Sequence, residues 1–277
     1  MNFTKMHGLG NDFIILNQLD DIQQDYVKLA QTLCDRNTGI GADGILLILP
    51  SKVADIKMRI LNIDGSEAEM CGNGIRCFAK YLYEHDILKK TTFTVETKAG
   101  IIKPSLHIVD QKVKQITIDM GEAILEREQI PMLGPKGKVI DEILDVAGQE
   151  YNITSVLMGV PHTILFVEDI TAIDPRVLGP KIEKHHKFPQ NTNVNFVQVI
   201  DKHTIKVKTW ERGAGATLAC GTGCCASVVA SYLNGFTEDI VDVQVKLGTL
   251  HIKYRPNESV QMTGAASEVF SGIYDIK

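Results

Sequence analysis

Two glycine-rich segments of this chain place a cysteine where a helix is expected to begin. The first reads NIDGSEAEMCGNGIRCFA around Cys71, and the second reads WERGAGATLACGTGCCAS around Cys220. Each contains Cys-Gly-x-Gly before a helical pattern, and the cysteines are 149 residues apart (220 minus 71), a little over half of the 277-residue chain. A single turn of this kind would be a weak signal, because glycine occurs wherever a backbone bends sharply. The repeat indicates two related halves.

A cysteine at a helix start is suited to acid/base chemistry. A thiol with a pKa of about 8.5 is mostly protonated at neutral pH, but unpaired N–H groups and the positive end of the helix dipole favour the thiolate. If the two halves face each other, their helix starts would bind a carboxylate. One thiolate would then take an α-proton, and the other thiol would return a proton from the opposite face. The predicted outcome is inversion at carbon.

Proton removal from an amino acid normally uses an electron sink such as pyridoxal phosphate. The segments HGLGND and NTGIGADG are glycine-rich, but neither matches the P-loop or a G-x-G-x-x-G between strand and helix. No pair of cysteines has the C-x-x-C spacing of a zinc site. We therefore expect no cofactor and no metal. The alternative from another class is a thiol redox or metal-binding protein, which predicts bound zinc or a C-x-x-C dithiol.

The remaining cysteines are expected to be buried and inert. Cys34, Cys77, Cys224 and Cys225 lie on or near helical patterns with apolar neighbours. All six cysteines are predicted to be reduced thiols, because the start of the chain has no hydrophobic signal region and the protein is expected in the cytosol.

The composition excludes several classes of protein. With 44% apolar and 23% charged residues the chain is predicted to be fully folded. A net charge of −5 makes nucleic acid an unexpected partner, and no apolar run is long enough to span a membrane. The basic stretch 181–187 is interpreted as a solvated helix end.

Period-two patterns outnumber helical ones. Alternating apolar residues predict strands near 56–60, 93–95, 205–207 and 241–245, and helical spacing predicts helices over 26–33, 75–82 and 228–233, the last ending at Gly235. A shorter helix is expected to begin at Asp174, with Pro175 in its first position. Strands that do not alternate regularly with helices favour an α+β protein with mostly antiparallel pairing.

Several motifs together resemble one known family. In order, they are MHGLGNDF, NIDGSEAEMCGNG, MGVPH, NTNVNF, WERGAGATLACGTG and MTGAA, and the likeness runs from residue 3 nearly to the C-terminus. They resemble diaminopimelate epimerases. The resemblance implies cofactor-independent interconversion of LL- and meso-2,6-diaminopimelate, on the bacterial route to lysine and to peptidoglycan precursors.

The resemblance also implies an architecture. It predicts two pseudo-symmetric domains, each a mixed, mostly antiparallel sheet rolled around a central helix, usually in a homodimer. We expect residues 1–117 with 264–277 to form the half that carries Cys71, and residues 118–263 to form the half that carries Cys220.

Carried over by position, the resemblance assigns the site. Cys71 and Cys220 would be the two acid/base groups, and His162 and Glu211 would help to set thiol ionisation. Side chains and backbone groups that would hold the amino-acid substrate are those of Asn11, Asn62, Asn193, Glu211 and Arg212, and of Gly72, Asn73, Gly221 and Thr222.

Three positions depart from the family pattern. The chain has Val160 where many members have asparagine, Gly44 where some have glutamine, and Ala216 where many have glutamate. The first two positions bear on contacts to the distal end of the substrate. Val160 therefore leaves an alternative open, a relative that acts on another amino acid or on hydroxyproline.

Overall fold

The computed structural model describes residues 1–19 and 25–275, and the chain divides into two compact units. Unit 1 comprises Met1–Asp119 with Thr263–Lys277, and unit 2 comprises Met120–Met262. These boundaries lie two residues after and one residue before the positions expected from the sequence. Both ends of the chain therefore belong to unit 1, whose first strand β1 (Asn2–Gly8) pairs with the last strand β19 (Ser267–Ile273).

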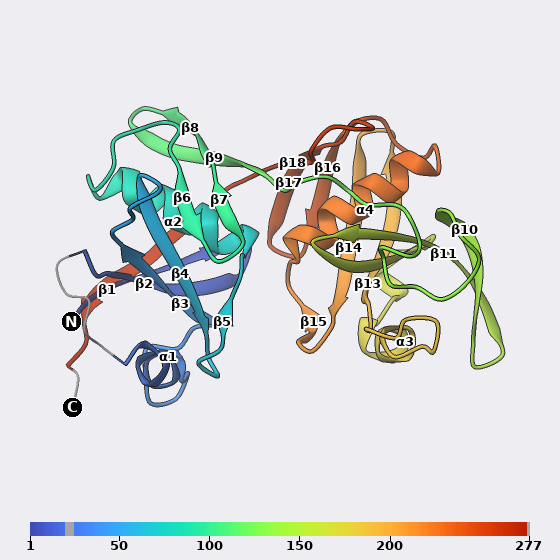
Figure 1. The fold of residues 1–277 in the computed structure, drawn as a ribbon, viewed down its shortest axis with the longest axis horizontal. Coiled ribbons are helices and arrows are strands. Elements are labelled where there is room, and N and C mark those ends of the chain that lie inside the picture. The colour runs from blue at the N-terminus through green and yellow to red at the C-terminus, as the bar shows by residue number, and fades with distance from the viewer. Residues whose placement is uncertain (20–24, 276–277) are drawn as a thin grey trace. The chain divides into compact units, whose positions relative to one another are not determined.

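Unit 1 is built on a mixed sheet with the strand order β19-β1-β2-β3-β4-β6-β7, and β5 lies beside β4 (Figure 1). The remaining bounds are β2 (Asn11–Asn17), β3 (Gly44–Leu49), β4 (Ile56–Asn62), β5 (Glu67–Ala68), β6 (Val95–Thr97) and β7 (Gly100–Ile102). Helix α1 (Tyr26–Cys34) contacts β3 and β4. Leu29, Leu33 and Leu47 form part of the apolar core between them.

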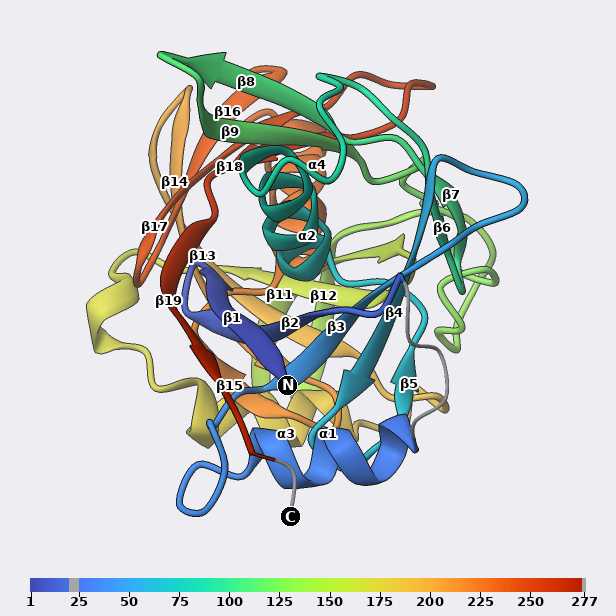
Figure 2. The same cartoon turned by 90° about the vertical axis from the view of Figure 1, so that its left-hand side faces the viewer.

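Helix α2 (Gly72–Glu84) runs through the middle of unit 1 (Figure 2). It contacts β1 and β2 on one side and β9 on the other. Strand β9 (Lys112–Asp119) forms a hairpin with β8 (Ser105–Val109). Residues 72–79 are buried without interruption, which places this helix inside the unit rather than on its surface.

Unit 2 repeats this plan. Its strand order is β10-β11-β12-β13-β14-β16-β17, with β15 beside β14. The bounds are β10 (Val139–Val146), β11 (Gln149–Met158), β12 (Val160–Phe166), β13 (Asn193–Asp201), β14 (Thr204–Glu211), β15 (Gly215–Thr217), β16 (Ile240–Val245) and β17 (Gly248–Lys253), and β18 (Gln261–Gly264) spans the second boundary. Going across either sheet, the successive pairings are antiparallel, antiparallel, parallel, antiparallel, parallel and antiparallel.

The helices repeat as well. Helix α3 (Pro175–Glu183) follows β12 as α1 follows β2, after a short 3-10 helix η1 (Ile170–Ala172). Helix α4 (Gly221–Leu233) contacts β11 to β14, β16 and β17, and residues 223–231 are buried throughout. The hydroxyls of Ser227 and Ser231 donate to the carbonyls of Gly223 and Ser227, so these polar side chains are satisfied inside the unit. The α+β class and the duplication predicted from the sequence are confirmed.

The helices occur where the sequence predicted them. The helix expected to begin at Asp174 has that residue as its N-cap and Pro175 in its first turn. Helix α4 ends at Leu233, Asn234 caps it, and Gly235 follows with a φ of +71°, a conformation that favours glycine. The basic stretch 181–187 covers the end of α3 and contains exposed Lys181, Lys184 and His186. None of the helices in residues 1–19 and 25–275 has the length and apolarity needed to span a bilayer.

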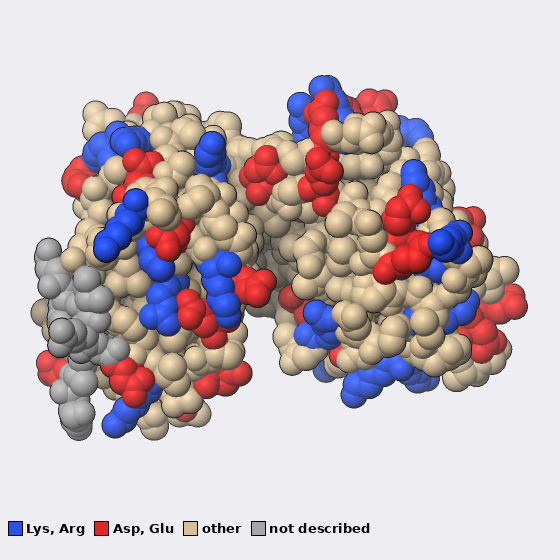
Figure 3. Space-filling model, in the orientation of Figure 1, with Lys and Arg blue, Asp and Glu red and all other residues tan. Residues whose placement is uncertain are grey.

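Acidic and basic side chains are interspersed on the face of each unit shown in Figure 3. That face carries no broad patch of a single charge on either unit. This distribution matches a chain with 29 basic and 34 acidic residues.

Candidate active site

Cys71 and Cys220 occupy the same position in the two repeats. Each is the N-cap residue of its unit's central helix, α2 or α4, with an extended backbone (φ −143° and ψ 117° for Cys71, φ −115° and ψ 113° for Cys220). The amide of Gly74 donates to the sulfur of Cys71 over 3.4 Å. The sulfur of Cys220 lies 3.4 Å from the hydroxyl oxygen of Thr222. The sequence predicted both helix starts.

The other four cysteines are buried in their helices, as expected. Burial raises the pKa of Cys34 and of Cys77 to about 12, so neither thiol ionises near neutral pH. Cys71 is half-buried, whereas Cys220 is only 6% exposed.

The thiol of Cys220 departs from the expectation based on its helix start alone. Its pKa is raised well above the usual value, first by burial and then by the negative charge of Glu211. Hydrogen bonds from Thr222 and from the amide of Gly223 act in the opposite direction. Desolvation and a neighbouring carboxylate therefore outweigh the helix N-terminus, and Cys220 is a protonated thiol in this structure.

In unit 1 the structure brings Asn11 and Asn73 to Cys71. The Cys71 thiol donates to Oδ1 of Asn11 over 3.5 Å, and the side-chain amide of Asn73 donates to the same oxygen over 3.3 Å. Asn11 is the first residue of β2, and Gly72 and Asn73 form the buried first turn of α2. Asn62 is the last residue of β4, and its amide donates to the hydroxyl of Ser66 over 3.0 Å.

In unit 2 the predicted residues gather at the ends of neighbouring strands. Glu211 ends β14 and accepts a hydrogen bond from Thr217 on β15. Asn193 begins β13, and its side-chain oxygen accepts from the backbone amide of Arg212 over 2.7 Å. The guanidinium of Arg212, an exposed residue, donates to the carbonyl of Gln190 over 2.7 Å. Gly221 and Thr222, which begin α4, are both partly exposed.

His162 is completely buried on β12, next to Asn193 in the parallel pairing with β13. Burial, with a smaller contribution from the charge of Arg212, lowers its pKa to about 3, so the imidazole is neutral. Its Nδ1 lies 3.1 Å from the side-chain nitrogen of Asn195, while its Nε2 is buried and has no hydrogen-bond partner among residues 1–19 and 25–275. Since an amide nitrogen only donates, Nδ1 accepts and the proton is placed on Nε2.

Asn195 is a residue that the sequence analysis missed. It is fully buried, its oxygen accepts from Thr209 over 3.0 Å, and it fills the space beside Gly223, where a Cβ would lie 2.5 Å from that oxygen. It therefore joins His162 to the start of α4. The signal was the third asparagine of NTNVNF, which alternation along a strand places on the same face as Asn193.

The close approach of two strands explains why this chain has glycine at position 44. It begins β3, and a Cβ there would lie 2.6 Å from the carbonyl oxygen of Leu61 on the neighbouring strand β4. A side chain at this position would require the two strands to shift. Val160 begins β12 and is partly exposed.

The structure therefore contains two groups of predicted site residues, one in each unit. The first includes Cys71, Asn11 and Asn73, and the second includes Cys220 and Glu211. Within the described parts of the chain, no three side chains of the types His, Cys, Asp and Glu gather to hold a metal ion.

The sequence of the chain is similar to one family of known proteins. Residues 3–126 and 154–269 match the sequence model of a family described as diaminopimelate epimerase. A diaminopimelate epimerase of Pelotomaculum thermopropionicum is 51% identical over 276 residues, with 99% of each chain covered. One from Caldanaerobacter subterraneus is 52% identical, with 100% of each chain covered.

Solved structures with low identity share the fold. A phenazine biosynthesis protein of the PhzF family from Bacillus anthracis has a TM-score of 0.73 and 18% identity, with 100% of this chain and 99% of that chain covered. A hydroxyproline epimerase from Agrobacterium vitis has a TM-score of 0.67 and 17% identity, with 98% of this chain and 91% of that chain covered.

Proposed function

This chain belongs to the diaminopimelate epimerase family, and on that premise we propose that it interconverts LL- and meso-2,6-diaminopimelate with two cysteines and no cofactor. The observation that carries the mechanism is the repeated placement of Cys71 and Cys220 at the N-caps of the two central helices. An isomerase with one acid/base group on each face of a carbon needs such a matched pair.

The reaction is a proton exchange at one α-carbon. One cysteine, as thiolate, removes the α-proton, and the electron pair that remains is delocalised into the substrate carboxylate. Backbone N–H groups in the first turns of α2 and α4, at Gly72, Asn73, Gly221 and Thr222, stabilise that added charge. The other cysteine, as thiol, donates a proton to the opposite face, so the centre is inverted and the two sulfurs exchange protonation states.

We propose that Glu211 and His162 prepare the unit 2 thiol. The charge of Glu211 raises the pKa of Cys220, and a carboxylate in this position can accept the proton when the thiol must ionise. His162 stays neutral and keeps a proton on a buried nitrogen that has no partner within the described part of the chain. That nitrogen is available to donate a hydrogen bond to a bound group.

The distal end of the substrate carries a second ammonium and a second carboxylate, so it needs several polar side chains. We assign this task to Asn11, Asn62, Asn193 and Arg212. A guanidinium can bind a carboxylate through two parallel hydrogen bonds, and amide oxygens can accept from an ammonium. The exposed guanidinium of Arg212 needs only to leave the Gln190 carbonyl to reach a ligand.

A second candidate function is epimerisation of another amino acid or of hydroxyproline, which Val160 favours because it removes one side-chain amide from the site. A panel of LL-diaminopimelate, proline, hydroxyproline and simple monocarboxylate amino acids distinguishes the two. We expect kcat/KM to be highest for diaminopimelate, and a preference for a monocarboxylate amino acid would transfer the assignment to the second candidate.

Independence from a cofactor is tested in the same assay. The purified protein is treated with EDTA and with hydroxylamine, which captures pyridoxal phosphate, and is then assayed on LL-diaminopimelate. We expect full epimerisation after both treatments. Loss of activity that added metal or pyridoxal phosphate restores would contradict the two-thiol proposal.

We further propose a homodimer that works in the cytoplasm, where all six cysteines stay reduced. Strand β19 is the edge of the unit 1 sheet, and it exposes Val269, Phe270 and Ile273, with exposed fractions of 53%, 46% and 76%. An apolar edge strand of this kind is suited to pairing with a second copy. Val269→Lys with Ile273→Lys should convert the dimer to a monomer in light scattering, and an unchanged mass would exclude this edge as the interface.

A further inference from the structure

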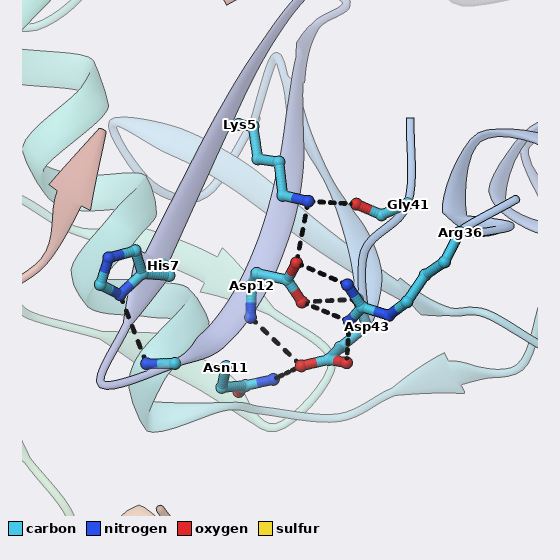
Figure 4. Close-up of polar contacts among 8 residues, drawn as sticks. Lys5, His7, Asn11, Asp12, Arg36, Gly41 and Asp43 are labelled. Atoms are coloured by element: carbon cyan, nitrogen blue, oxygen red, sulfur yellow. Dashed lines mark hydrogen bonds and ion pairs between the residues drawn. The ribbon is translucent and has the colours of Figure 1, made fainter. Parts of the chain in front are cut away.

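A polar network on the β1–β2 side of unit 1 joins charged residues to Asn11 (Figure 4), and Asn11 in turn contacts Cys71. The side-chain nitrogen of Asn11 donates to Oδ2 of Asp43 over 2.8 Å, and the backbone amide of Asp12 donates to the same oxygen over 3.2 Å. Arg36 donates to the other carboxylate oxygen of Asp43 over 2.8 Å. The Asp43 carboxylate is therefore held by three donors.

The guanidinium of Arg36 is itself fixed. It forms two hydrogen bonds to Asp12, of 2.8 and 3.1 Å, and Asp12 also pairs with Lys5 at 3.0 Å. Burial, the largest influence, raises the pKa of Asp12, but the contacts with Arg36 and Lys5 together lower it to about 2. Asp12 is thus ionised at every physiological pH, and it keeps Arg36 beside Asp43.

A buried arginine fixes the network from the helix side. Arg76 is fully buried, and it donates to the side-chain oxygen of Asn73 over 2.6 Å and to the carbonyl of Gly72 over 2.9 Å. A guanidinium only donates, so the oxygen of Asn73 must face Arg76 and its nitrogen must face Asn11. The 3.3 Å contact from that nitrogen to Oδ1 of Asn11 follows.

Both ends of the network give Asn11 the same orientation. A carboxylate only accepts, so the nitrogen of Asn11 faces Asp43, and its oxygen is directed to Asn73 and to the sulfur of Cys71, 3.5 Å away. We propose that Asp43 is a positioning residue for the reaction, which fixes the amide of Asn11 so that its oxygen, and not its nitrogen, faces Cys71.

This orientation has a chemical consequence. An amide oxygen can accept a hydrogen bond from a thiol but not from a thiolate, whereas an amide nitrogen would donate to a thiolate. The network therefore favours the protonated form of Cys71, the form that gives a proton to the substrate. The inference rests on the proposed function for the role of Cys71, but the orientation of Asn11 can be tested without any substrate.

The test measures the rate of iodoacetamide alkylation of Cys71 against pH, read from the Cys71 peptide by mass spectrometry. Asp43→Ala removes the acceptor that holds the Asn11 nitrogen and leaves the longer 3.3 Å contact from Asn73 to orient the amide. The nitrogen can then turn to the sulfur, so the midpoint should fall by about one pH unit, the effect of one hydrogen bond. Asp43→Asn removes the charge but keeps an oxygen that accepts from Asn11, so the midpoint of Cys71 alkylation should equal that of wild type. The matched control is Glu96→Ala, which breaks the ion pair with Lys57 elsewhere in unit 1.

A double variant separates positioning from other effects. Asn11→Ala should lower the midpoint by itself, and adding Asp43→Ala to it should change nothing more. Equal shifts in Asp43→Ala and Asp43→Asn would assign the effect to charge and overturn the proposal. So would an unshifted Asp43→Ala, or a further shift in the double variant. If Asp43→Ala folds poorly, Asp43→Ser removes the same contact and is read in the same way.

Activity gives the second readout. If the proposed function holds, Asp43→Ala should lose about ten-fold in kcat, since a misplaced acid/base group slows the chemical step, and Asp43→Asn should recover most of it. If the protein proves inactive on diaminopimelate, the proposed function fails while the alkylation result still decides the role of Asp43.

Discussion

Burial decides the protonation of two residues in the candidate site. His162 lies completely inside unit 2 and is neutral, and Cys220 has its pKa raised by burial and by Glu211. The sequence located both residues, but it gave the wrong direction for the Cys220 thiol, because desolvation depends on neighbours from distant parts of the chain. Asp43 and Asn195 were missed for the same reason, since their partners Asn11 and His162 lie 32 and 33 residues away.

The low pKa of His162 predicts an acid-sensitive fold. In the unfolded chain this imidazole gains a proton near pH 6.5, whereas in the folded protein it does so only near pH 3. Stability is thus fully present above pH 6.5 and falls as the pH drops below it. When the pH falls from 7.5 to 5.5, this residue should lower the free energy of unfolding by about 1.4 kcal/mol. Urea unfolding at both pH values measures this loss.

The comparison variant for this prediction is His162→Gln, which cannot titrate. The unfolding free energy of His162→Gln should change between the two pH values by about 1.4 kcal/mol less than that of wild type. His203→Gln, at an exposed histidine whose side chain is 65% accessible, serves as control and should behave as wild type. An identical pH dependence in His162→Gln and wild type would show that the buried imidazole is not responsible.

At the level of elements, the second glycine of the repeated motif Cys-Gly-x-Gly packs against different neighbours in the two helices. This glycine is Gly74 in α2 and Gly223 in α4. A Cβ on Gly74 would first meet a methyl carbon of Leu46 at 3.3 Å, whereas a Cβ on Gly223 would lie 2.5 Å from the Asn195 oxygen. The sequence showed the shared motif, but the different neighbours come from other strands.

Gly223→Ala should therefore be the more harmful of two matched substitutions. It forces Asn195 away from His162 and Thr209, and overpacking of this kind costs about 1 to 3 kcal/mol. Gly74→Ala meets the Leu46 methyl at 3.3 Å, and the Cys71 Cβ and the Phe13 ring at 3.4 and 3.5 Å. These contacts are longer than the one at Gly223, and alanine gains helix propensity, so the cost should be smaller. Thermal unfolding of both variants measures the difference. Equal losses of Tm would mean that the Asn195 contact does not govern the start of α4.

Across the whole molecule, the duplication was readable from the sequence because a motif with an unusual composition occurs twice at half-chain spacing. The identical order of parallel and antiparallel pairings in the two units confirms it. The pairing order itself could not be predicted, since the partners of a strand such as β19 lie at the opposite end of the chain.

The proposed two-thiol mechanism predicts sensitivity to oxidation. Mild oxidant should join Cys71 to Cys220, because two cysteines can be bridged once their Cα atoms are within about 7 Å. Activity should be lost and then restored by reductant, and peptide mapping without reduction should recover the cross-linked pair. Cys71→Ser and Cys220→Ser should give no cross-link. Activity that persists under oxidant would argue against opposed thiols.

The two-thiol mechanism is tested most directly by proton exchange in deuterium oxide. Reduced protein is incubated with LL-2,6-diaminopimelate, and epimerisation and α-deuteration are followed for wild type, Cys71→Ala and Cys220→Ala. We predict meso product labelled at the inverted centre by wild type, and no epimerisation by either variant, because each lacks the acid/base group on one face. Substantial epimerisation by either variant would contradict the assignment of Cys71 and Cys220 as the two acid/base groups.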